Sequence, residues 1–257
     1  IERIRAMFRG DAEPPIHGDQ RYTREGMLMV AMTTGYRGLI AHMYGRYPEA
    51  QEKYGTAIVI LQRLNEQRAL AHFQRHFASL LGKRETAEAQ ISHAIRAAQS
   101  AQQMDIFHRA RVVRADLMYK ISADPDVRRR ALQDIKNALR YAALSDCYRV
   151  RIEASASLAR HMREGGDFDT ALRYATDALT TACRYGHSLH KTLLRIEIAQ
   201  ILMARGDPRS GDALLEQATE IASSKGYYLA LERVRRARTE HAASKPMSNR
   251  TDIPISE

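Results

Sequence analysis

The chain is poor in the residues that mark membrane, secreted and metal-binding proteins. Its 257 residues include no tryptophan and only two cysteines, Cys147 and Cys183, which lack the spacing of a metal site. No apolar run approaches the ~20 residues that a membrane span needs, and we expect no secretory leader. These absences exclude transmembrane and disulfide-rich classes. They predict a cytoplasmic protein with no membrane partner, in which both thiols are small packing or surface groups.

Proline is also scarce. The seven prolines lie near the ends of the chain or at expected turns: Pro14, Pro15, Pro48, Pro125, Pro208, Pro246 and Pro254. Because proline breaks the interior of a helix, this distribution favours long helices that are uninterrupted between turns. The composition, with 44% hydrophobic and 27% charged residues, is typical of exposed amphipathic helices.

One block of sequence recurs five times, and its clearest copy runs from Gly165 to Gly186. In that copy Gly166 and Asp167 break one helix and cap the next, and Ala171 and Ala178 lie two turns apart on one face. The five turn positions, 37, 44, 40 and 40 residues apart, are Gly45, Gly82, Asp126, Gly166 and Gly206. Small residues follow at Ala50, Ala87, Ala131, Ala171 and Gly211, and again at Ala57, Ala94, Ala138, Ala178 and Ala218. The expected helix ends are Asn65, Gln102, Asp146, Gly186 and Gly226. A period of roughly 40 residues predicts an array of two-helix repeats.

The repeats divide the chain into three parts. Residues 1–22 are expected to form a partial helix and a linker, and because Ile1 looks like the middle of a helix we expect a longer parent protein. Residues 23–243 are the predicted repeat domain, which begins at Thr23 as an N-cap and ends in an unpaired capping helix from Tyr227 to about Ala243. Residues 244–257 lack periodicity and are expected to be a flexible tail.

The aligned blocks resemble the tetratricopeptide repeat (TPR) family. That motif has three small-residue positions, and the one in the first helix is occupied here by Gly38, Ala115, Ala159 and Ala199. Arg75 takes this position in the second hairpin, the consensus tryptophan is absent, and the repeat is longer than usual. The long repeats are similar to those of bacterial maltose-activator-type regulators, or to those of the peptide-sensing response-regulator phosphatases. The resemblance implies an all-α, right-handed α-solenoid of about five hairpins with a C-terminal capping helix.

A search for catalytic chemistry finds little. His72 and His76 are spaced i, i+4, but no glutamate of a zincin motif and no nearby cysteine or aspartate completes a metal site. The loop Gly165–Phe168 superficially resembles that of nucleotide cyclases, yet it falls where the repeat requires a turn. His187 and His190 are expected on the surface. The sequence therefore predicts a chain that is no enzyme and needs no metal or cofactor.

The resemblance to TPR proteins implies a binding groove lined by the first helix of each hairpin. Matched position by position, the groove residues are His42, His72, His76, Arg109, Asp116, Lys120, Glu153, Arg160, Arg163, Gln200, Arg233 and Arg236. Arginine and histidine on a concave surface favour a carboxylate-bearing or phosphorylated ligand. The alternative is that many of these residues are solvated surface charges, some of them paired along their helix.

Three functions remain open at this stage. The leading one is a protein-interaction or ligand-sensing module that regulates a larger signalling or transcription-regulatory protein, with an acidic peptide, a protein or its own effector domain as partner. The net charge of +10 also fits nucleic-acid binding through Arg128–Arg130 and Arg233–Arg238, although no aromatic residues interleave with them to stack bases. The third is self-association as a homodimer through Met27, Met29 and Met32.

Overall fold

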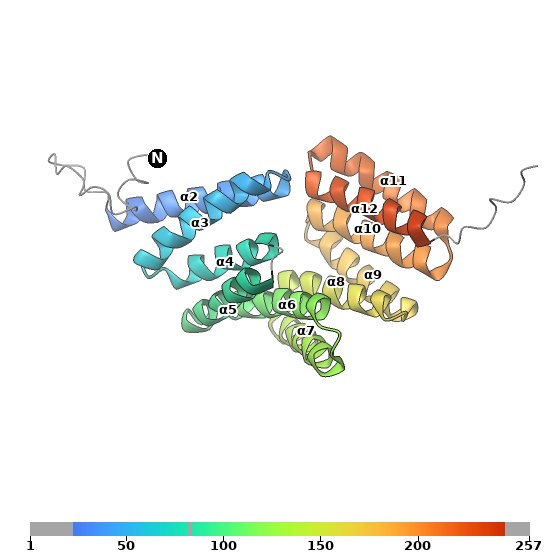
Figure 1. Ribbon diagram of the computed structural model, residues 1–257, viewed down its shortest axis with the longest axis horizontal. Helices are drawn as coiled ribbons and strands as arrows, with labels where there is room; N and C mark the ends of the chain where they lie inside the picture. Colours follow the sequence, from blue (N-terminus) through green and yellow to red (C-terminus); the bar gives the residue numbers. More distant parts are fainter. Residues whose placement is uncertain (1–22, 82–83, 245–257) are drawn as a thin grey trace, which may run out of the picture.

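The computed structural model describes residues 23–81 and 84–244, and within these ranges it contains helices and no strands (Figure 1). The all-α class is therefore confirmed. The helices are α2 (Arg24–Met43), α3 (Tyr47–Arg63), α4 (Gln67–Leu81), α5 (Arg84–Ser100), α6 (Met104–Ile121), α7 (Pro125–Ser145), α8 (Tyr148–Glu164), α9 (Phe168–Arg184), α10 (Ser188–Arg205), α11 (Pro208–Lys225) and α12 (Tyr228–Ser244). None of them is both long and apolar enough to cross a membrane. The predicted linker 1–22, the turn residue Gly82 and nearly all of the predicted tail lie outside the described residues.

Local signals set the helix boundaries where the sequence predicts them. Thr23 caps α2 by accepting a hydrogen bond from the Gly26 backbone N–H, and Asp167 and Asp207 cap α9 and α11 in the same way. Left-handed residues stand at the helix ends, where they allow the chain to reverse. These residues are Gly45, Asn65, Gln102, Asp146, Gly166, Gly186, Gly206 and Gly226. All five predicted helix ends are among them, so that prediction is confirmed.

One turn residue was predicted wrongly. Asp126 lies inside the first turn of α7, and the N-cap is Asp124, whose side chain accepts a hydrogen bond from the Asp126 N–H. Pro125 is the first residue of the helix, where its missing N–H has no partner to lose. The turn before α7 therefore ends two residues earlier than the alignment of the repeats placed it.

Consecutive helices pack as pairs, and alanine lies at the contacts between them. The pairs are α2–α3, α4–α5, α6–α7, α8–α9 and α10–α11, and α12 packs against the last pair. The aligned alanines of the second helices are at most 1% exposed: Ala50, Ala57, Ala87, Ala94, Ala131, Ala138, Ala171, Ala178 and Ala218. Gly211 is also buried. Because these side chains are so small, neighbouring helices can approach closely, which gives the fold its repeat-like architecture.

The first helices of the pairs lie side by side in chain order. Contacts join α2 to α4, α4 to α6, α6 to α8, α8 to α10, and α10 to α12. The ends of this row also meet, since α12 contacts α2 (Figure 1). The rings of Tyr44 and Tyr228 are 5.9 Å apart, and the Tyr47 hydroxyl donates a hydrogen bond to Glu232. We call the surface formed by α2, α4, α6, α8, α10 and α12 the inner face.

Candidate binding surface on the inner face

The twelve predicted groove residues all lie on helices of the inner face. His42 belongs to α2, His72 and His76 to α4, and Gln200 to α10. The helix α6 carries Arg109, Asp116 and Lys120; α8 carries Glu153, Arg160 and Arg163; α12 carries Arg233 and Arg236. The contacts below show which of these side chains come together and which stay separate.

Glu153 of α8 joins three helices through two arginines. Its carboxylate accepts from Nε and Nη2 of Arg109 of α6, at 3.0 and 2.6 Å, and from Nη1 of Arg75 of α4, at 3.3 Å. Burial acts to raise the pKa of Glu153, but the two guanidinium groups outweigh it and lower that pKa to about 2. We call Arg75, Arg109 and Glu153 the arginine–glutamate cluster. It contains two positive charges and one negative charge, and the negative charge of Asp105 on α6 also acts on both arginines.

Histidines border the arginine–glutamate cluster, and they are neutral at pH 7. Arg75 Nη2 lies 2.9 Å from His76 Nε2, and the rings of His76 and His72 are 4.9 Å apart. Burial, followed by the charge of Arg75, lowers the pKa of both histidines, that of His72 to about 3. The pKa values of His42 and His190 are also lowered, first by burial. The positive charge of this region therefore comes from arginine alone.

Some buried polar atoms near the arginine–glutamate cluster have no hydrogen-bond partner among the described residues. They are the Tyr54 hydroxyl, His72 Nε2 and Arg75 Nε. A buried polar atom without a partner reduces stability by about 1–3 kcal/mol, so folded proteins rarely retain one. Within the described residues no group of three histidine, cysteine, aspartate or glutamate side chains is arranged to hold a metal ion.

A second cluster centres on Asp116 of α6. Its carboxylate accepts from Arg160 at 2.7 Å and from the Ser157 hydroxyl at 2.6 Å, and His161 Nε2 lies 3.1 Å away. Burial opposes ionisation of Asp116, but Arg160 and His161 lower its pKa well below the usual range. Three partners on α8 thus hold α6 against α8 through a single aspartate.

A third set of contacts joins α8, α10 and α12. Arg163 donates to Glu197 at 3.0 Å, and Glu240 accepts from Arg236 at 2.8 Å and from Gln200 at 3.2 Å. Arg233 is different, because it is exposed and pairs with no carboxylate of the described residues. Lys120 is also exposed.

In the basic segment Arg128–Arg130, which was predicted for nucleic-acid binding, two of the three arginines make contacts within the chain. Arg128 lies over the Tyr119 ring at 4.8 Å and donates to the Ser122 carbonyl, and Arg129 pairs with Asp126 at 3.1 Å. Arg130 is exposed. The segment is therefore a weaker phosphate-binding surface than its sequence suggests.

The methionines proposed for self-association do not form one exposed face. Met29 is 68% exposed, whereas Met27 and Met32 pack against a hydrophobic core cluster. Of the two cysteines, Cys147 is half-buried before α8 and Cys183 is exposed, and neither forms a disulfide. His187 and His190 are half-buried, with their rings 5.5 Å apart.

Sequence reasoning missed several side chains that organise the inner face: Arg75, Ser157, His161, Glu197 and Glu240. Arg75 gave the clearest signal, since it interrupts a column of small residues in the aligned repeats. Its side chain is only 5% exposed, so a charged side chain is buried at a position that small residues occupy in the other hairpins. The other four carried no signal in the repeat pattern.

The contact between α2 and α12 leads to a testable prediction. Replacing Tyr228 with alanine and Tyr47 with phenylalanine removes the tyrosine pair and the hydrogen bond to Glu232. We expect the two ends of the row of helices to separate and the radius of gyration in small-angle X-ray scattering to increase. Tyr185→Phe, which keeps the stacked ring against Tyr148, is the control and should change nothing. An unchanged radius in the double variant would show that other contacts hold the ends together.

No protein-family model and no curated protein sequence matches the chain. The resemblance to tetratricopeptide repeats therefore depends on the five internal copies and on their alanine, glycine and capping positions.

Proposed function

We propose that the chain is a non-catalytic protein-interaction or ligand-sensing module that binds an acidic peptide or protein segment on its inner face. In this proposal the paired helices form a right-handed, tetratricopeptide-like α-solenoid of five hairpins, with α12 as its capping helix. The module regulates a larger intracellular protein in signalling or transcription, and its partner is a separate protein or its own effector domain. Support comes from the repeated pairs of helices and from the charge of the inner face.

The observation that carries the proposal is an excess of guanidinium groups over carboxylates in the clusters of the inner face. The six arginines are Arg75, Arg109, Arg160, Arg163, Arg233 and Arg236, and the four acids are Asp116, Glu153, Glu197 and Glu240. The pairs within the chain neutralise most of this charge and hold the helices in place. The excess remains at the arginine–glutamate cluster, where Asp105 offsets part of it, and at Arg233, and an anionic ligand would compensate the remainder.

Arg233 provides the sharpest test, because reversing its charge breaks no ion pair with a described residue. We expect Arg233→Glu to weaken binding of an acidic partner at least tenfold, since a charge-assisted hydrogen bond contributes about 1.5–3 kcal/mol. The matched control is Arg235→Glu, which makes the same charge change on another side of α12. Both variants should keep the circular dichroism spectrum of the wild type.

The experiment is affinity capture from native lysate with the full chain, followed by mass spectrometry. A protein retained by the wild type and by Arg235→Glu, but lost with Arg233→Glu, supports binding on the inner face. Equal capture by all three proteins would contradict it. Recovery of nucleic acid that disappears at moderate salt would instead favour phosphate binding.

A further inference from the structure

We propose a second binding site, separate from the inner face, in a pocket between α3, α4 and α5 that takes a small carboxylate with an N–H donor on the neighbouring carbon. This chemistry occurs in a free amino acid and in the C-terminal residue of a peptide. The proposal rests on the pocket, on a buried side chain without a partner, and on the types of residue that line it.

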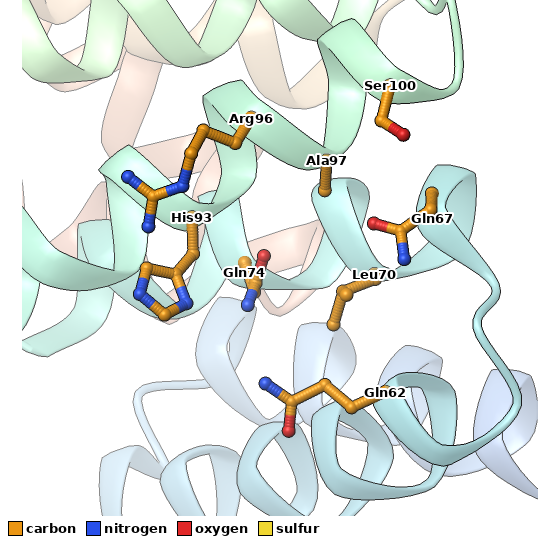
Figure 2. Close-up of a pocket in the computed structure, with 8 residues that line it drawn as sticks. All are labelled: Gln62, Gln67, Leu70, Gln74, His93, Arg96, Ala97 and Ser100. Carbon is orange, nitrogen blue, oxygen red and sulfur yellow. The ribbon is translucent and has the colours of Figure 1, made fainter.

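The pocket has a volume of about 360 Å³, within the ~300–1,000 Å³ range of small-molecule sites. Its lining comes from three helices that two neighbouring pairs bring together, and Figure 2 shows these side chains around one space. They are Gln62 of α3; Gln67, Leu70 and Gln74 of α4; and His93, Arg96, Ala97 and Ser100 of α5. Two of the three helices, α3 and α5, are second helices of their pairs, so the pocket is not part of the inner face.

Gln74 is the residue that points to a ligand. Its side chain is only 1% exposed, and its Oε1 atom has no hydrogen-bond donor among the described residues. An amide oxygen that is buried without a donor destabilises the fold, whereas a methionine or leucine at this position would not. The amide lies among the lining side chains in Figure 2, but its Oε1 atom is closed to solvent, so a small rotation of the amide must open it before a bound N–H group can supply the missing hydrogen bond.

The other side chains that line the pocket indicate which class of ligand it can bind. It contains no carboxylate, and Arg96 and His93 are exposed at one side of the pocket (Figure 2). A guanidinium group binds a carboxylate through two parallel hydrogen bonds, so Arg96 is the expected anchor for the acid. Leu70 and Ala97 are buried and offer an apolar contact. A ligand with a carboxylate, an adjacent N–H and an apolar side chain satisfies all three features.

The test is isothermal titration calorimetry of the full chain with L-leucine, N-acetyl-L-leucine and N-acetyl-L-leucine amide. We expect binding of at least one of the two acids, and at least tenfold weaker binding of the amide, which lacks the carboxylate. Tighter binding of L-leucine assigns the site to free amino acids. Tighter binding of N-acetyl-L-leucine assigns it to peptide C-termini. If none of the three binds, or if the amide binds as tightly as the acids, the proposal is wrong.

Two variants connect any binding to the pocket. Gln74→Met keeps the length of the side chain but removes the amide, and we expect it to abolish binding and to raise the melting temperature. Arg96→Gln should weaken the binding of both acids until their affinity equals that of the amide. Gln99→Met, on the exposed part of α5 outside the pocket, is the matched control and should bind as the wild type does. Retained binding by Gln74→Met, or a lower melting temperature, would contradict the role assigned to Gln74.

Discussion

Replacing Glu153 with glutamine is expected to lower the free energy of unfolding by about 3 kcal/mol at pH 7. The change keeps the shape of the side chain but leaves Arg75 and Arg109 without their shared carboxylate. Removing one partner of a buried ion pair destabilises proteins by ~3–5 kcal/mol, and we expect the lower end because solvent reaches Glu153 in part. The lowered pKa of Glu153 predicts a similar loss of stability, because a pKa that differs by one between the folded and unfolded chain corresponds to ~1.4 kcal/mol. Urea denaturation followed by circular dichroism measures the difference.

The effect of Glu153→Gln should depend on pH in one direction. Because the pKa of Glu153 is about 2 in the folded chain and 4.5 as an unperturbed group, its ionised form stabilises the fold fully above pH 4.5. This contribution is lost as the pH falls toward 2. The difference between wild type and variant should therefore shrink from about 3 kcal/mol at pH 7 to roughly half of that at pH 3.

Glu240→Gln is the matched control for Glu153→Gln. It removes the same charge from an exposed i, i+4 pair with Arg236, and such pairs contribute at most about 1 kcal/mol. If the two variants were equally stable at pH 7, the arginine–glutamate cluster would not be an important support of the fold. A difference that stays constant between pH 7 and pH 3 would also contradict the assigned ionisation of Glu153.

The features predicted well from the sequence depend on local stereochemistry. Asn65 and Gly186 lie at helix ends because a left-handed conformation closes the last turn, and the identity of a single residue signals it. Ala57 and Ala178 are buried because only a small side chain fits where two helices cross. Each of these signals is weak in a single copy of the repeat, but the five copies together make the pattern clear. Asp126 was misplaced because several candidate capping residues lie together around Pro125, and the repeat pattern does not choose between them.

The contacts of the inner face could not be predicted from the sequence. The predicted positions fall on the helices of the inner face, but Arg75 and its partner Glu153 are 78 residues apart, and Arg160 and Asp116 are 44 apart. Which acid meets which arginine depends on how each helix is rotated against the next, and the repeat pattern fixes that rotation only approximately. The structure shows that Arg109, Arg160 and Arg163 hold helices together. Whether they also contact a partner stays a prediction.

The contact between the first two pairs of helices leads to a second prediction with a large expected effect. Gly35 of α2 faces the ring of Phe73 of α4, and a methyl group added at Gly35 would overlap that ring. Phe73 is fully buried and packs edge-on against Tyr36, so it cannot move aside easily. Alanine in place of a helical glycine gains about 1 kcal/mol in helix propensity, whereas overpacking a core commonly costs about 1–3 kcal/mol. We expect the overlap to dominate, so that Gly35→Ala lowers the free energy of unfolding by about 1–2 kcal/mol.

Gly55→Ala is the matched control, and its effect should have the opposite sign. Gly55 lies inside α3, and a methyl group added there would meet no atom within 4 Å. Only the gain in helix propensity remains, so this variant should be more stable than the wild type by about 0.5–1 kcal/mol. Adding Phe73→Leu to Gly35→Ala should recover part of the loss, because a smaller side chain makes room for the methyl group. Stabilisation by both glycine substitutions in urea denaturation would show that α2 and α4 are not in close contact at Gly35.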